Sequence, residues 1–131
     1  SLKAISTERD WNGWIAFFLR AIIEQAGQNI RRVEAIKTLY DEMKVAIQET
    51  THSQYSVHLL DAIFSKPIFR TSDLAQQLAA DYGIHDKTAP ALLRQLRDAG
   101  ILRELQPGSG RRAATLCFPR LINLAEGREV L

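Results

Sequence analysis

The chain has 131 residues, of which 46% are hydrophobic, and this proportion supports a globular core and argues against disorder. Its 17 basic and 15 acidic side chains give a net charge of +2, which is too small to indicate a nucleic-acid-binding protein by itself. The single cysteine, Cys117, excludes a disulfide within the chain and fits a reducing compartment. The sequence shows no apolar run long enough to cross a bilayer and no signal peptide, so we expect a cytoplasmic protein that does not bind membranes.

The first predicted helix has one wide apolar face that is rich in aromatic residues. Its members recur at helical spacing and are Trp11, Trp14, Ile15, Phe18, Leu19, Ile22, Ile23 and Ala26. We expect this face to pack in a core, and an aromatic ligand cage is the alternative. Gly27 and Asn29 predict a helix stop and a new cap, although Gly27 inside one longer helix is left open.

The second predicted helix ends at about Gln48 and has a narrow apolar seam. The seam residues are Val33, Ile36, Tyr40, Met43 and Ile47. We expect the seam to pack on the first helix as an antiparallel hairpin, and a homodimer contact is the alternative. The polar stretch 49–55 follows. It predicts a boundary between a helical segment, residues 1–52, and a second domain, residues 53–131.

The second domain contains the pattern of a helix-turn-helix. Thr71 is expected to cap one helix, and residues 82–85 form a short turn that contains a glycine. Asp86 is expected to cap the next helix, which has Pro90 in its first turn. Gly100 ends that helix in a left-handed conformation.

Short strands and further helices complete this pattern. Before it we expect a helix over residues 57–64 and a brief strand over 68–70, and after it a strand from Ile101, a turn at 107–110 and a return strand at 113–118. A final helix is expected around residues 121–125. The predicted fold is therefore mainly α, with an N-terminal helical hairpin followed by a winged helix-turn-helix domain with a small β-hairpin wing.

The exposed side of the helix 86–98 and the hairpin form the candidate binding surface. Residues 86–112 carry six basic and three acidic side chains, so the basic excess lies there. On duplex DNA, Arg94 could reach guanine or phosphate, Gln95 adenine, and Thr88 phosphate. Because the excess is small, we favour protein contact or scaffolding over DNA binding. The candidate residues are Lys87, Thr88, Arg94, Gln95, Arg97, Arg111 and Arg112.

The sequence predicts no catalytic, metal or cofactor site in this segment. The three histidines, His52, His58 and His85, have no His or Cys partner at a metal-binding spacing. Cys117 alternates with Leu116 and Phe118 in a predicted strand, so we expect a buried structural thiol. A self-contained enzyme is therefore the least favoured class.

Two parts of the chain together resemble the C-terminal region of Fic (filamentation induced by cAMP) family proteins. The run from Arg9 to Leu19, RDWNGWIAFFL, resembles a helix near the end of the Fic domain. The second domain resembles the winged helix that follows this helix in many bacterial Fic proteins. The segments that carry this second resemblance are residues 59–67 (LLDAIFSKP), 72–75 (SDLA), 87–89 (KTA), 93–96 (LRQL) and 98–102 (DAGIL).

The resemblance implies a parent protein that transfers AMP from ATP onto hydroxyl side chains of other proteins. Fic proteins do this with a His-Pro-Phe-x-Asp/Glu-Gly-Asn-Gly-Arg loop, and no histidine of this chain precedes a proline. No catalytic residue is therefore carried over, and ATP and Mg are implied only for the catalytic part of the parent. The implied partners are a target protein or the Fic domain itself. The alternative is a winged-helix transcriptional regulator that binds duplex DNA and has a helical dimerisation arm.

Overall fold

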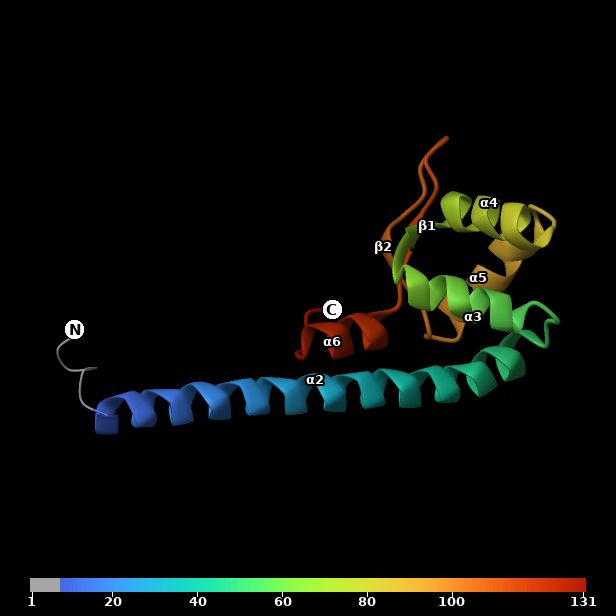
Figure 1. Ribbon diagram of the computed structural model, residues 1–131. Coiled ribbons are helices and arrows are strands. Elements are labelled where there is room, and N and C mark those ends of the chain that lie inside the picture. Colours follow the sequence, from blue (N-terminus) through green and yellow to red (C-terminus); the bar gives the residue numbers. More distant parts are fainter. Residues whose placement is uncertain (1–7) are drawn as a thin grey trace. The chain divides into compact units, whose positions relative to one another are not determined.

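A computed structural model describes residues 8–131 and shows five helices and a small antiparallel sheet in this range (Figure 1). The elements are α2 (Glu8–Thr51), α3 (Ser56–Ser65), β1 (Ile68–Arg70), α4 (Thr71–Tyr82), α5 (Thr88–Asp98), β2 (Arg103–Gln106), β3 (Thr115–Cys117) and α6 (Pro119–Glu126). The mainly α class and the hairpin wing are thus confirmed. The contacts divide the chain into two compact units, one that ends at Glu34 and one from Ala35 to Leu131.

The expected helical hairpin is wrong, because α2 is one continuous helix from Glu8 to Thr51. Gly27 does not adopt a positive φ angle, and a Cβ atom there would make only an ordinary contact with the Arg31 side chain. Asn29, expected as a cap, instead accepts a hydrogen bond of 3.2 Å from the Gln25 amide one turn earlier. A glycine inside a helix costs only about 1 kcal/mol relative to alanine, so the surrounding helix formers override it.

The aromatic face of α2 is exposed in the structure, so the expectation that it packs in a core is not met within the described residues. Trp14 is 55% exposed and Phe18 is 50% exposed. Their rings stack at 5.5 Å between centroids, and Trp11 stacks on Trp14 at 5.9 Å. The helix of this first unit therefore presents a continuous apolar surface.

The core of the second unit includes the C-terminal part of α2. Leu39, Met43 and Ile47 are each at most 4% exposed and belong to the same cluster as the buried residues of α3 to α6. The contacts therefore separate the units at Glu34, whereas the sequence pattern placed a domain boundary after residue 52. The seam from Tyr40 to Ile47 packs on this core rather than on a second helix of a hairpin.

Polar and aromatic contacts join α2 to the rest of the second unit. The Tyr40 hydroxyl donates a 2.7 Å hydrogen bond to the Asp61 carboxylate on α3. The Tyr40 ring also meets Phe64 edge to face, with 5.2 Å between ring centroids. At the end of the helix the Ser56 hydroxyl donates to the Gln48 side-chain oxygen at 2.6 Å. These bonds fix α3 against residues 40–48 of α2.

The helix-turn-helix forms with the expected glycines and without the expected caps. Gly83 ends α4 at φ +68° and Gly100 follows α5 at φ +80°, both in the left-handed region. Thr71 does not cap α4, because β1 runs directly into the helix and the Thr71 N–H donates to the Ala114 carbonyl at 3.0 Å. Asp86 does not cap α5 either, since α5 begins at Thr88 with Lys87 at the cap position and no cap bond comes from the Asp86 carboxylate.

The sheet has the order β1-β3-β2, with both pairs antiparallel. β2 begins at Arg103 rather than Ile101, because Leu102 is buried and its N–H donates to the Leu96 carbonyl at 3.2 Å. The hairpin turns at Gly110-Arg111 and not at residues 107–110, since Ser109 and Arg112 exchange two backbone hydrogen bonds. Gly110 has φ +58°, as the first central residue of a II′ hairpin turn requires.

Candidate partner-binding surface

The turn before α5 is built around His85. Its Nδ1 atom accepts the Lys87 N–H at 3.2 Å, and its carbonyl accepts the Thr88 N–H at 3.0 Å. These two bonds satisfy backbone donors at the start of α5 that have no partner inside the helix. His85 therefore makes the backbone contacts at the turn where the sequence pattern assigned a cap to Asp86. Histidine is not one of the residues preferred as helix caps, so the sequence contains no signal for this role.

The structure places the predicted residues on two parts of the second unit. On α5, Arg94 and Gln95 are exposed, and Lys87 is exposed just before the helix. Thr88 is half-buried. Arg111 lies in the hairpin turn itself, and the exposed Arg112 pairs with Ser109 next to it. Their role in binding stays a prediction.

A hollow of about 170 Å³ lies between α5 and the base of the hairpin, and it brings together two of the predicted residues, Arg94 and Arg97. Residues that the sequence reasoning missed make up the rest of its wall. Its lining residues are Thr71, Pro90, Leu93, Arg94, Arg97, Ala114 and Leu116. Pro90 was interpreted only as a helix-start signal, and no local pattern links Thr71 to Ala114, because only the folded sheet places them together.

Arg97 is less available than its exposure on α5 suggests. Its guanidinium lies 3.2 Å from the Asp98 carboxylate and 3.4 Å from the Glu104 carboxylate on β2. Two acidic groups thus compensate one cation. Arg94, in contrast, makes no ion pair within the described part of the chain. The sequence could not distinguish these two arginines, because Glu104 reaches Arg97 through the tertiary fold.

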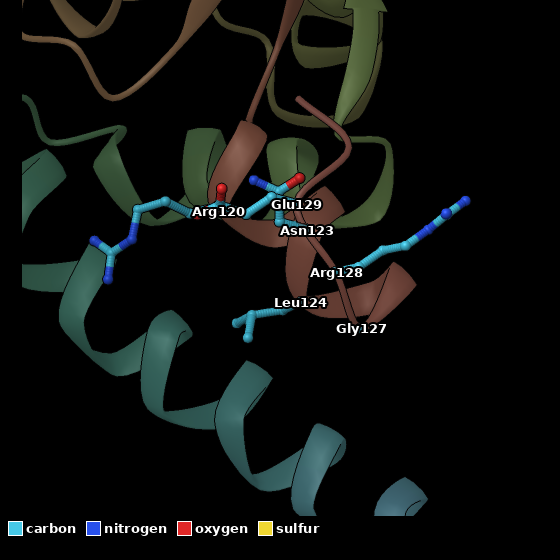
Figure 2. A pocket seen from close by; sticks show the side chains of 6 residues that line it. All are labelled: Arg120, Asn123, Leu124, Gly127, Arg128 and Glu129. Carbon is cyan, nitrogen blue, oxygen red and sulfur yellow. The ribbon is translucent and has the colours of Figure 1, made fainter.

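A larger hollow, of about 480 Å³, lies at the C-terminal end of α6, but its charges do not converge (Figure 2). Figure 2 shows Arg120 extending toward α2 and Arg128 extending away in the opposite direction. Arg120 forms two hydrogen bonds with Glu42, at 2.8 and 3.3 Å. The Asn123 side chain is occupied with the backbone of Val130 and Leu131. The hollow therefore has no free cluster of donors for an anion.

Reactive groups elsewhere in the described chain are held in structural contacts. Cys117 is fully buried, as predicted for a structural thiol, and this burial raises its pKa against the smaller opposing effect of Arg103. His58 stacks on Tyr82 with 3.9 Å between ring centroids. Within residues 8–131, no group of three His, Cys, Asp or Glu side chains is arranged to hold a metal ion. None of the helices described is both long and apolar enough to span a bilayer.

Comparison with known protein families assigns the segment that contains most of this surface to one family. Residues 39–112 match the family described as "Protein adenylyltransferase SoFic-like, C-terminal domain". The match covers more than half of the chain, from the first buried residue of α2 through α5 to the wing arginines. This finding confirms the resemblance to the C-terminal region of Fic proteins. The chain belongs to the family of C-terminal domains of SoFic-like protein adenylyltransferases.

Proposed function

We propose that this chain is the non-catalytic C-terminal part of a bacterial Fic-type protein adenylyltransferase and serves as a docking module. The catalytic part of the parent would transfer AMP from ATP to protein hydroxyl groups, with ATP and Mg bound there and not on this chain. The family match and the sequence resemblance of residues 9–19 to the end of a Fic domain support this proposal. A buried thiol in a chain with one cysteine fits a cytoplasmic location.

The single observation that carries the docking role is the exposed aromatic face of α2. Trp14, Phe17 and Ile23 are 55, 66 and 69% exposed, which is unusual for large apolar side chains so close together. A fully covered aromatic side chain buries about 150–250 Å². Covering the exposed half of one such side chain, at about 25 cal/mol per Å², therefore contributes about 2–3 kcal/mol. We propose that the catalytic Fic domain of the parent covers this face.

The test uses the intact parent protein and compares Trp14→Ser with Val45→Ser. Both side chains are more than half exposed on α2, but only Trp14 belongs to the aromatic face. Trp14→Ser should lower the melting temperature of the parent by several degrees and reduce AMP transfer to a protein target, since a covered tryptophan would be lost. Val45→Ser should change neither. An unchanged melting temperature for Trp14→Ser would contradict the proposal.

The second candidate is duplex DNA binding by α5 and the wing. The favouring observation is the helix-turn-helix with exposed Lys87 just before its second helix, exposed Arg94 on that helix and two arginines at the wing turn. Binding to a 20-base-pair duplex should then weaken steeply with salt, and Arg94→Ala combined with Arg111→Ala should flatten that dependence. No binding at about 50 mM salt would exclude this function.

A homodimer is a third possibility for the assembly, and the exposed part of the α2 seam supports it. Val33 is 66% exposed and Ile30 is 59% exposed on the same helix, whereas Met43 and Ile47 are used in the core. A second copy could cover the exposed part. Light scattering on the parent protein and on Val33→Glu would distinguish a dimer, which the charge should weaken, from a monomer.

A further inference from the structure

The hollow between α5 and the wing differs from an anion-binding surface in the chemistry of its wall. Four of its seven lining residues are apolar: Pro90, Leu93, Ala114 and Leu116. At about 170 Å³, it is comparable to an engineered cavity of about 150 Å³ that admits one benzene ring. The hollow therefore has room for one branched aliphatic or aromatic side chain.

The charges beside the hollow accommodate one carboxylate rather than a polyanion. Arg94 lines the hollow without an ion pair in the described chain, whereas Arg97 is held by Asp98 and Glu104. The two carboxylates repel a row of phosphates, as DNA would present. A single carboxylate can pair with Arg94 alone. It neither gains nor loses much from Arg97, because the charge of that side chain is already compensated by Asp98 and Glu104.

We infer that the hollow, with Arg94 at its rim, is a docking site for a protein segment that presents one bulky apolar side chain next to one acidic residue. The apolar side chain would enter between Pro90 and Ala114, and the acidic side chain would accept hydrogen bonds from the Arg94 guanidinium. This inference rests on the proposed docking role, and it names the kind of partner. Such a segment belongs to a protein that the parent binds or modifies.

The test measures peptide binding to the chain by amide chemical shifts in NMR spectra. The probes are the peptides Ser-Gly-Ser-X-Glu-Ser-Gly-Ser, with Leu, Phe, Trp or Ser at X, and the same set with Gln in place of Glu. At least one apolar peptide should bind with Kd on the order of 10⁻⁴–10⁻³ M, as expected for a few buried groups. Its shifts should centre on Thr71, Arg94 and Ala114. The Ser peptide should not bind.

Arg94→Gln should weaken the Glu peptide about three- to tenfold and leave the Gln peptide unchanged, because only the Glu peptide uses the charge. Arg128→Glu, a charge change outside the hollow, should affect neither peptide. Ala114→Leu should fill the hollow and abolish binding of every apolar peptide. If Ala114→Leu disturbs folding, the Arg94→Gln comparison of the Glu and Gln peptides still decides the question.

Three results would overturn the inference: no apolar peptide binds more tightly than the Ser peptide, the shifts centre elsewhere, or a 20-base-pair duplex binds while the peptides do not. The proposed function has a separate readout. If the peptides fail while Trp14→Ser still destabilises the parent, only the docking site is wrong. If the peptides bind and Trp14→Ser has no effect, the docking site stands and the proposed role of α2 is wrong.

Discussion

The substitution Ile47→Ala tests whether the end of α2 is part of the core of the second unit. Ile47 is 1% exposed and packs in the same cluster as the buried residues of α3 to α6. The change removes three carbon groups, each worth about 0.8 kcal/mol when buried, or about 2.4 kcal/mol together. The cavity adds to this loss, and measured Ile→Ala changes in cores cost about 2–5 kcal/mol. The higher helix propensity of alanine offsets only a few tenths of a kcal/mol of this loss.

The matched control is Val45→Ala, two residues earlier on the same helix. Val45 is 57% exposed, so its loss should change the free energy of unfolding by no more than about 0.5 kcal/mol. Both variants lie in the same helix and both replace a β-branched residue by alanine. The comparison therefore separates burial from helix propensity.

The assay is urea unfolding of the full chain, followed by circular dichroism. Ile47→Ala should lower the urea concentration at the unfolding midpoint. The decrease is the lost free energy, at least about 2 kcal/mol, divided by the denaturant slope, which is typically about 1–3 kcal/mol per M in urea. Equal effects of the two substitutions would refute the placement of Ile47 in the core. A loss below about 1 kcal/mol for Ile47→Ala would do the same, because no fully buried isoleucine should cost so little.

Three further changes probe single contacts. Tyr40→Phe should destabilise the chain by about 1 kcal/mol at pH 7. Because the hydrogen bond to Asp61 raises the Tyr40 pKa, the stabilisation is present below pH 10 and is lost as pH rises through the folded-state pKa. Urea unfolding should show this alkaline loss for the wild type and not for the variant, and parallel pH profiles would contradict it. Gly100→Ala should cost about 1–2 kcal/mol in the same assay because of its φ of +80°, whereas Gly13→Ala should stabilise α2, and a neutral Gly100→Ala would show that the turn relaxes. Cys117 should react with a thiol reagent only when urea unfolds the chain, and rapid labelling in buffer would show that it is accessible.

The local signals in the sequence were sufficient for the order of the short helices and strands that follow α2. The helical spacing of Leu92, Leu93 and Leu96 matches three buried positions of α5, and Gly100 ends that helix region as expected. Apolar periodicity and a glycine stop act within a few residues, so a sequence pattern can show them. The short strand at Ile68–Arg70 followed from the proline before it and was also confirmed.

The errors arose where a local signal competed with a longer-range one. Gly27 carries the same stop signal as Gly100, but nothing in the neighbouring residues shows which of them turns left-handed. The polar residues 49–55 mark the end of a helix and were interpreted as a domain boundary, while the buried side chains of α2 lie before them.

The position of the candidate surface could be predicted from the sequence, but which of its arginines has an uncompensated charge could not. The pattern placed Arg94 and Arg97 on the exposed side of α5, which the structure confirms. Their difference depends on Glu104, which is seven residues from Arg97 and belongs to a strand. The apolar wall of the hollow depends on contacts between α4, α5 and β3, and such contacts between distant segments leave no spacing rule in one sequence.

The buried end of α2 also has a consequence for where the second unit can be cut out of a longer chain. The family match begins at Leu39, which is the first core residue of α2, and not at the loop after the helix. A fragment cut at the loop would lack Leu39, Met43 and Ile47 and so lose three core side chains. A fragment meant to keep this core therefore has to begin inside α2, upstream of Leu39.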